Sequence, residues 1–309
     1  MRRMKQRPFW PLMILIILAV AAVVSMQPQK RGTASLTPSN SPERRNQLTV
    51  YYLDVGQGDS EFIELPDGRS MLIDAGNPEN GGQIARFLDT QSIKKIDYLV
   101  ATHPHADHIG GMPQVVQSID IGSVYMPKVS ATSRTFENLL SSIQKKGLQI
   151  QTARAGVTLL DRGDLKAVLV APVGSGYNDL NQYSAVIKLS YDNTSFLFMG
   201  DAGAQSEKEI TADVRADVLK VGHHGSDTAS TEAFLKRVSP RYAVIEVGKD
   251  NSYGHPAEST LKKLRRIGAE IYRTDEDGTI KIQSDGNNIT VEEHVPGMEE
   301  ADASMRPAA

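Results

Sequence analysis

The sequence contains no cysteine. Disulfide bridges, thiolate catalysis and zinc sites with cysteine ligands are therefore excluded, and so is lipid attachment through an N-terminal cysteine. Any metal ion must be bound by histidine, aspartate or glutamate side chains. The single tryptophan, Trp10, lies in an apolar run near the N-terminus, which leaves tyrosine and phenylalanine for any stacking on a nucleic-acid base.

Positive charge is scarce in most of the chain. Of the 34 lysines and arginines, eight lie within residues 1–45, which contain only one of the 37 acidic residues. Residues 46–309 therefore carry 26 basic and 36 acidic side chains. Strong non-specific binding of nucleic acids relies on many contacts from basic side chains to phosphates, so an acidic domain is not its usual footprint. The charge balance weakens the case for a nuclease acting on long DNA without excluding it.

A long apolar run occurs only at the N-terminus. Four basic residues among the first seven precede a charge-free run of 16 residues at positions 9–24, which is the layout of an export signal. The run is slightly short for a bilayer-spanning helix, and a small-residue cleavage site is only weakly present at residues 22–25. Residues 1–26 are thus either a cleaved signal peptide or an N-terminal membrane anchor. In both cases we expect the rest of the chain outside the cytoplasm, either secreted or anchored to the membrane.

Composition divides the remainder into three parts. Residues 27–45 are rich in proline, serine, threonine, asparagine and glutamine without a hydrophobic period, as in a flexible linker. Residues 46–295 form the expected folded domain. Residues 296–309 again lack periodicity, which predicts a disordered tail.

Strand-like and helix-like patterns alternate through the domain. Strands are expected at 48–54, 60–65, 70–73, 96–101, 184–191, 195–199, 218–221, 242–247, 270–272, 279–283 and 288–292. Helices are expected at 81–90, 113–119, 232–238 and 257–267. Turn residues predict three hairpins, across Asp67-Gly68, Asp192-Asn193-Thr194 and Asp285-Gly286. Many strands with few helices predict an α+β fold in which two sheets pack face to face with helices outside.

A dense cluster of metal-ligand residue types follows the apolar strand at 96–101. Within six positions the sequence places His103, His105, Asp107 and His108, followed by a glycine pair that permits a tight turn. An isolated histidine is usually structural, but four candidate ligands at the end of a buried strand predict a metal site on a rigid base. Imidazole and carboxylate ligands together suit zinc, manganese or iron.

Two further apolar strands end in the same residue types. Asp201 follows the strand at 195–199, and His223 and His224 follow the strand at 218–221. A lone aspartate after a strand is ordinarily a turn residue. Here its convergence with two other strand ends is what a two-metal site requires, because no single segment surrounds two cations and a carboxylate can bridge ions about 3.5–4 Å apart.

These motifs resemble the metallo-β-lactamase superfamily over roughly residues 48–292. The resemblance rests on the His-x-His-x-Asp-His segment at 103–108, Asp74 in Leu72-Ile73-Asp74-Ala75-Gly76, Asp201 after its strand and a late histidine. Three segments narrow it to the hydrolase domain of the ComEC DNA-uptake (competence) family, namely 53–59 (LDVGQGD), 219–226 (LKVGHHGS) and 253–256 (YGHP). The resemblance implies an αββα four-layer sandwich with the site at one edge of the two sheets.

The resemblance also implies one or two divalent metal ions, zinc or manganese. The first ion would be bound by His103 and His105 and the second by Asp107 and His108. Asp201 would bridge them, and either His223 or His224, with His223 preferred, would complete the second ion.

The sequence departs from the superfamily pattern in the residues expected to bind the first ion. The superfamily usually supplies another histidine between the signature and the bridging aspartate, but residues 178–184 (NDLNQYS) contain none. The first ion is therefore expected to be weakly bound, under-coordinated or completed by Asp179 or Asn181, and a single-metal enzyme remains an alternative.

Several polar residues are expected beside the ligands. Asp74 is expected to orient a ligand histidine. Asp54, Gln57 and Asp59 are expected either to cap a glycine-rich turn or to adjoin the site, with equal weight. His255 is expected to contact the substrate rather than only to fix its loop.

The expected chemistry is attack by a metal-bound hydroxide, with Asp107 orienting it and taking up its proton and with His255 and His224 as further catalytic residues. The aspartate bridge, the missing histidine and the similar subgroup favour an exported phosphodiesterase or nuclease, with extracellular DNA a candidate substrate. The alternatives are an esterase acting on cell-wall phosphorylcholine or another ester, and a non-catalytic binding module. No protein partner is indicated, and contact with the membrane would come through an uncleaved N-terminal segment.

Overall fold

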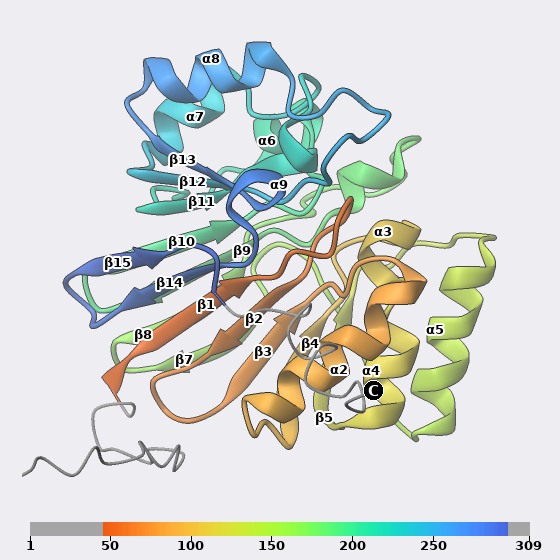
Figure 1. Cartoon of the computed structure of the whole chain (residues 1–309). Coiled ribbons are helices and arrows are strands. Elements are labelled where there is room, and N and C mark those ends of the chain that lie inside the picture. The colour runs from red at the N-terminus through yellow and green to blue at the C-terminus, as the bar shows by residue number, and fades with distance from the viewer. Residues whose placement is uncertain (1–45, 296–309) are drawn as a thin grey trace, which may run out of the picture. The chain divides into compact units, whose positions relative to one another are not determined.

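The computed structural model describes residues 46–295 (Figure 1). The expected signal peptide or anchor, the linker and the tail all lie outside the described residues. None of the helices within 46–295 combines the length and the apolar character that crossing a bilayer requires.

The first sheet contains eight strands in the order β15-β14-β1-β2-β3-β4-β5-β6. Its strands are β1 (Leu48–Tyr52), β2 (Glu61–Glu64), β3 (Ser70–Ile73), β4 (Lys95–Val100), β5 (Asp120–Met126), β6 (Ile150–Thr152), β14 (Ile280–Ser284) and β15 (Ile289–Glu292). The pairs from β3 to β6 are parallel and the others antiparallel, so the sheet is mixed.

The second sheet contains seven strands in the order β13-β12-β11-β10-β9-β8-β7. Its strands are β7 (Thr158–Arg162), β8 (Leu165–Leu169), β9 (Ile187–Tyr191), β10 (Thr194–Phe198), β11 (Val218–Lys220), β12 (Tyr242–Ile245) and β13 (Glu270–Arg273). This sheet is also mixed, with parallel pairing from β10 to β13.

Helices cover the outer face of each sheet (Figure 1). The α-helices are α2 (Gly81–Thr90), α3 (Ala106–Ile109), α4 (Met112–Ser118), α5 (Arg134–Lys145), α6 (Ala204–Glu209), α7 (Glu232–Val238), α8 (Glu258–Arg266) and α9 (Thr274–Asp277). Short 3₁₀ turns are η2 (Pro78–Asn80), η3 (Leu180–Tyr183) and η4 (Gly222–Gly225).

Three clusters of buried apolar residues lie between the layers. The central cluster joins the two sheets, for example through Val50 and Phe198. A second packs α2, α4 and α5 on the first sheet, and a third packs α7 and α8 on the second sheet. This arrangement confirms the α+β class and the αββα sandwich, because each sheet buries one face against the other sheet and one against helices.

The three hairpins predicted from turn residues are confirmed. The strand pairs β2–β3, β9–β10 and β14–β15 are antiparallel neighbours. The expected helices at 81–90 and 232–238 match α2 and α7. No helix or strand was predicted for residues 120–179, which contain β5–β8 and α5.

The parallel strands bring the candidate ligands to one edge. Strand β4 ends just before the segment 101–108, whereas β10 and β11 end just before Asp201 and the histidine pair. Because β10 and β11 are parallel neighbours, their carboxyl ends meet at the same edge of the second sheet. Loops from both sheets therefore converge there.

Candidate metal centre

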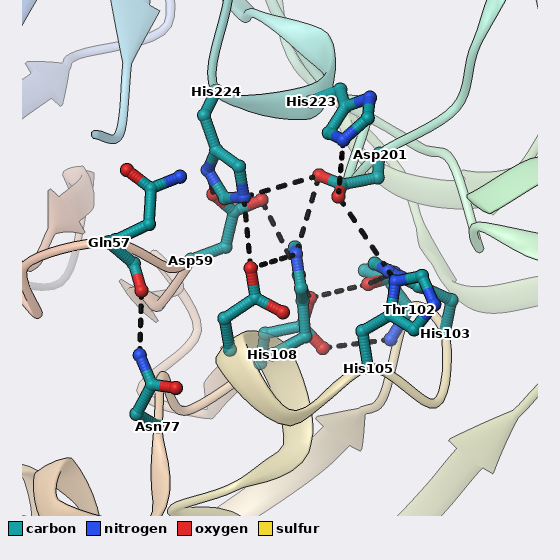
Figure 2. Close-up of polar contacts among 12 residues, drawn as sticks. Gln57, Asp59, Asn77, Thr102, His103, His105, His108, Asp201, His223 and His224 are labelled. Atoms are coloured by element: carbon teal, nitrogen blue, oxygen red, sulfur yellow. Dashed lines mark hydrogen bonds and ion pairs between the residues drawn. The ribbon is translucent and has the colours of Figure 1, made fainter. Parts of the chain in front are cut away.

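Three loops bring their side chains together at this edge (Figure 2). The Nε2 atom of His103 lies 3.7 Å from Oδ2 of Asp201, and that of His108 lies 3.3 Å from Oδ1 of the same carboxylate. His103, His108 and Asp201 are all buried. The first and second sheets thus meet through the carboxylate that sequence analysis expected to bridge two ions.

One group of side chains surrounds the Oδ1 atom of Asp201. The Nε2 atom of His224 lies 3.7 Å from this oxygen and 3.4 Å from Oδ2 of Asp107. Nε2 of His108 lies 4.0 Å from the same Asp107 oxygen. Asp107, His108 and His224 offer atoms that all lie within 4.8 Å of one another, as a bound cation requires.

Unpaired buried atoms test whether a cation fits this group. Nε2 of His108, Nε2 of His224 and Oδ1 of Asp201 are buried and have no hydrogen-bond partner among the described residues. Such atoms are rare in folded proteins because each loses its contacts with water without replacement. A divalent ion bound among them would satisfy all three, so these residues fit the second metal ion.

The structure reverses the preference between the two consecutive histidines. His224, rather than His223, faces Asp107 and His108, and His224 is buried. Nε2 of His223 instead lies 3.7 Å from Oδ2 of Asp201, the oxygen that also faces His103. Both histidines adopt left-handed backbone angles, with φ of 53° and 51°, and their rings are inclined at 62° to each other. The strained turn sends the two rings to different sides of Asp201, which sequence spacing alone does not show.

A second group forms around the Oδ2 atom of Asp201. His103, which follows a strand of the first sheet, faces this oxygen, and its Nε2 lies 3.0 Å from Nδ1 of His105. His223, which follows a strand of the second sheet, faces the same Oδ2 atom. Asp179, one of the two residues expected to complete this group, instead caps η3 by accepting hydrogen bonds from Asn181 N and Gln182 Nε2. His223 therefore occupies the side of Asp201 where sequence analysis found a histidine missing.

Buried carboxylates orient the two histidines of the second-ion group. Oδ2 of Asp74 lies 2.8 Å from Nδ1 of His108, in the position expected for an orienting residue. At His224 the hydrogen-bond partner of Nδ1 is the backbone carbonyl of Glu246 at 2.9 Å, and the Asp59 carboxylate lies beside it, with Oδ1 at 3.1 Å from the same nitrogen. An acceptor at Nδ1, carboxylate or carbonyl, fixes the tautomer that leaves Nε2 free to bind metal.

The three polar residues of the glycine-rich loop at 53–60 differ in their roles. Asp54 caps the turn by accepting a hydrogen bond from the Gly56 amide at 3.0 Å. Gln57 lines the metal pocket and accepts a hydrogen bond from the Gly248 amide at 3.1 Å. Asp59 is fully buried beneath His224. One residue is thus a turn cap and the other two adjoin the site.

A buried charged cluster beneath the site was not predicted from the sequence. Lys220, which looks like an ordinary residue of strand β11, has no exposed surface and forms an ion pair with Asp59. Burial alone would lower the pKa of Lys220, but Asp59 and the buried Glu246 and Glu61 outweigh it and raise that pKa well above its usual range. A lysine in an otherwise apolar strand was the available signal, since an unpaired buried charge is strongly disfavoured.

This cluster fixes which carboxylate is charged. Burial alone would raise the pKa of Asp59, but the ammonium of Lys220 and the imidazole of His224 outweigh it and hold that pKa at about 2. Burial and the nearby Asp59 charge raise the pKa of Glu246 to about 8. Asp59 is therefore the ionised partner of Lys220 and His224, whereas Glu246 is protonated at neutral pH.

Some ligand side chains already have the protonation that metal binding requires, whereas His224 must lose a proton. Burial lowers the pKa of His103, which keeps that imidazole neutral. Burial opposes ionisation of Asp201, yet the neighbouring His108 and His224 hold its pKa well below the usual range. Burial likewise lowers the pKa of His224, but Asp201 and Asp59 raise it to about 10. A cation would replace the proton on His224, so metal binding should release protons.

The metal pocket opens to solvent beside His255. The pocket has a volume of about 380 Å³, and its rim includes Gln57, Asn181, Tyr253 and His255. The ring of His255 lies 5.5 Å from that of His223, and its Nδ1 is buried without a hydrogen-bond partner among residues 46–295. His255 therefore lies where a substrate contact was expected.

Comparison with known proteins agrees with this geometry. The family model described as "Metallo-beta-lactamase superfamily" matches residues 53–248. The chain is 31% identical to ComE operon protein 3 of Bacillus subtilis over 76% of this chain and 33% of that protein. It is 27% identical to Competence protein ComA of Neisseria gonorrhoeae over 88% of this chain and 39% of that protein. The chain thus spans about a third of the length of the competence proteins it resembles.

A solved structure shares the fold. The diiron β-hydroxylase CmlA from Streptomyces venezuelae superposes with a TM-score of 0.51 at 16% identity, over 80% of this chain and 54% of that one. At this identity the similarity concerns the fold alone.

Proposed function

The chain belongs to the metallo-beta-lactamase superfamily, and from this premise we propose that it is an exported metal-dependent phosphodiesterase that acts on nucleic acid. The observation that carries the proposal is the pair of ligand groups on the two oxygens of Asp201, one with His103 and one with His108 and His224. Two cations spaced by one carboxylate match the arrangement that two-metal phosphodiesterases use to neutralise the attacking and leaving oxygens.

Three features support a phosphodiester rather than a lactam. The bridging ligand is an aspartate, a harder ligand than cysteine, and hard ligands suit the ions that assist phosphoryl chemistry. Within residues 178–184 the usual histidine is replaced by a polar segment. One relative is named as a competence protein, ComA of Neisseria gonorrhoeae, and competence is uptake of DNA.

Divalent ions bound here would supply a water of lowered pKa and neutralise charge on the attacked phosphate. The chain's own residues would bind the ions, orient the water and contact the substrate. Asp107 is only partly buried, and its carboxylate lines the pocket, where it can orient a water and accept its proton. His224 was also expected to act in catalysis, but its Nδ1 contacts Asp59 and Glu246 and its Nε2 points into the ligand group. We therefore assign His224 to metal binding and His255 to contact with the substrate.

A substrate panel tests the proposal. The full-length chain, loaded with Mn²⁺ or Zn²⁺, is offered bis-p-nitrophenyl phosphate, single- and double-stranded DNA, p-nitrophenyl phosphorylcholine and nitrocefin. We expect hydrolysis of bis-p-nitrophenyl phosphate and DNA, abolished by chelation. Asp201→Asn, which keeps the side-chain size but weakens both ligand groups, should reduce the rate by at least about 100-fold, about 2.7 kcal/mol.

Other outcomes reassign the function. Cleavage of p-nitrophenyl phosphorylcholine alone would support an esterase acting on a cell-wall polymer. Cleavage of nitrocefin alone would contradict the phosphodiester assignment. No cleavage by a protein whose metal content has been measured would support a non-catalytic binding module.

Export is a separate part of the proposal, supported by the basic and apolar segments at residues 1–26. Fusion of the chain to a reporter that folds only outside the cytoplasm should give an active reporter. Deletion of residues 1–26 should leave the reporter inactive. An active reporter after the deletion, or an inactive one before it, would contradict export.

A further inference from the structure

An exposed aromatic ring lies at the mouth of the metal pocket. Tyr253 is 69% exposed, more than any other large hydrophobic residue among positions 46–295, and it lines the pocket together with His255. Its ring stacks on that of His255 at 5.8 Å with an interplanar angle of 22°. One face of Tyr253 is thus supported by protein, which leaves an exposed apolar surface beside the metal ligands that a flat ring could cover.

Two further hollows follow the metal pocket, each adjoining the one before it. The metal pocket shares His105 and Ala106 with a second hollow, which is lined in addition by residues 130–133 and Leu180. The second hollow shares Ser130 and Leu180 with a third. Because each hollow has wall residues in common with the next, the three hollows lie in a row that leads away from Tyr253 past the metal centre, and this row is called the groove below.

The far end of the groove holds a second pair of aromatic rings. Tyr177 and Tyr183 line it together with Lys128. Their rings are 5.0 Å apart and nearly perpendicular, at 81°. The Gly174 amide donates to the Tyr177 hydroxyl at 2.7 Å and the Gly176 amide to the Tyr183 hydroxyl at 2.9 Å. Both rings are therefore fixed before any ligand arrives, which reduces the entropy lost on binding.

We propose that this groove binds a single strand of nucleic acid across the metal centre, with one base stacked on Tyr253 and another against Tyr177 and Tyr183. The proposal rests on the proposed function and names its substrate class. Successive aromatic rings along a groove are the usual means of binding single strands, since every base has a flat face to stack. Lys128 supplies a cation for a backbone phosphate at the far end.

Two observations favour a single strand over the alternatives. In a duplex the bases stack on one another, so their faces are not accessible to Tyr253. A cell-wall chain of polyol phosphates has no flat rings to use either aromatic site. Because residues 46–309 carry 26 basic and 36 acidic side chains, affinity must come mainly from stacking, and it should depend only weakly on salt concentration.

Binding by the full-length, metal-loaded chain is measured with a fluorescein-labelled, phosphorothioate-linked single-stranded dodecamer. Stacking contributes about 1–3 kcal/mol per base, so Tyr253→Ala should weaken binding by about tenfold. Tyr253→Phe, which keeps the ring, should bind within about twofold of the parent chain. Ile150→Ala is the matched control, because Ile150 is also an exposed hydrophobic residue but lies on strand β6 and does not line the groove. It should leave binding unchanged.

A scan with abasic nucleotides separates stacking from a general structural effect. Removal of one base at a particular position should weaken binding to the parent chain as much as Tyr253→Ala does, and should have little further effect on Tyr253→Ala itself. Equal sensitivity of both proteins at every position would overturn the stacking proposal. So would a duplex that binds as tightly as the single strand, or a parent chain with a dissociation constant above about 100 µM.

Failure here is distinguishable from failure of the proposed function. Bis-p-nitrophenyl phosphate is too small to span the groove, so its hydrolysis reports the metal centre alone. Hydrolysis without oligonucleotide binding would retain the phosphodiesterase and reject the groove. Binding without hydrolysis would retain the groove and reject the enzyme.

Discussion

At the scale of single residues, the consecutive histidines matter most. His223 and His224 are neighbours in sequence, yet they face different oxygens of Asp201. Sequence analysis placed a ligand at this pair but preferred His223 for the second ion. The choice depends on two left-handed backbone angles, which no spacing rule predicts.

Replacement of each histidine should remove a different ion. His224→Ala deletes a buried ligand next to Asp107 and His108, so we expect it to lose the second ion and keep the first. His223→Ala should weaken the first ion instead. Metal content per chain after dialysis, measured by mass spectrometry, distinguishes the two. Identical metal content in both variants would contradict the assignment.

Lys220 provides a second test at this scale. Lys220→Met leaves Asp59 buried without its cation, and breaking a buried ion pair in this way costs about 3–5 kcal/mol. Urea unfolding should show a loss of that size. Lys95→Met is the matched control, because Lys95 pairs with Asp97 on the surface and such pairs contribute little. Equal stability of the two variants would show that Lys220 does not stabilise the site.

At the scale of elements, the loop between β1 and β2 determines the position of a candidate catalytic residue. Gly58 has φ of +154°, and the next amide, that of Asp59, donates to the carbonyl of Asp107 at 3.1 Å. A Cβ atom at Gly58 would overlap that carbonyl oxygen. The close approach of two loops therefore requires glycine at this position.

Gly58→Ala should separate the two loops. We expect a loss of about 2 kcal/mol in the free energy of unfolding and a fall of at least about tenfold in metal-dependent hydrolysis, because Asp107 is displaced. Gly56→Ala serves as control, since Gly56 also has a positive φ, +72°, but a Cβ there meets open space. It should cost about 1 kcal/mol from backbone strain and leave metal content unchanged. Loss of activity in both variants would mean that strain, not contact with Asp107, is responsible.

Elements were predictable where pattern and turn chemistry agreed. The helix α7 begins at the expected residue because Thr231 caps it, and the Asp-Gly turns fixed two of the hairpins. Strand β6 was missed because all three of its residues are exposed, so it has no alternation to detect. Helix α5 had a detectable signal, a Ser133 cap followed by buried residues such as Phe136, Leu139 and Ile143 at helical spacing.

At the scale of the whole domain, the site joins the two sheets. His103 and His108 follow a strand of the first sheet, whereas Asp201 and His224 follow strands of the second. The sequence indicated which residues converge, because ligand types stood at three strand ends. The lysine in an apolar strand signalled a buried partner for Lys220, but the sequence could not identify Asp59 as that partner, since contacts between residues 161 positions apart depend on how the chain packs.

Removal of metal should therefore loosen the whole domain. An ion at 100 times its dissociation constant stabilises the folded state by about 2.7 kcal/mol. For a domain of this size we expect a chelator to lower the melting temperature by roughly 5–10 °C, with recovery when Zn²⁺ or Mn²⁺ is restored. Calorimetry with and without the chelator provides the measurement. An unchanged melting temperature in a protein that had contained metal would contradict coupling between the site and the two sheets.

The most direct test of the metal centre is an anomalous-scattering map from crystals of the metal-loaded protein, recorded at the absorption edge of the bound metal. We expect a peak about 2.0–2.2 Å from Nε2 of His108, Nε2 of His224 and an oxygen of Asp201. With two ions, a further peak should lie on the side of His103 and His223. A map without a peak at Asp201, from protein whose bound metal has been verified, would contradict this metal centre.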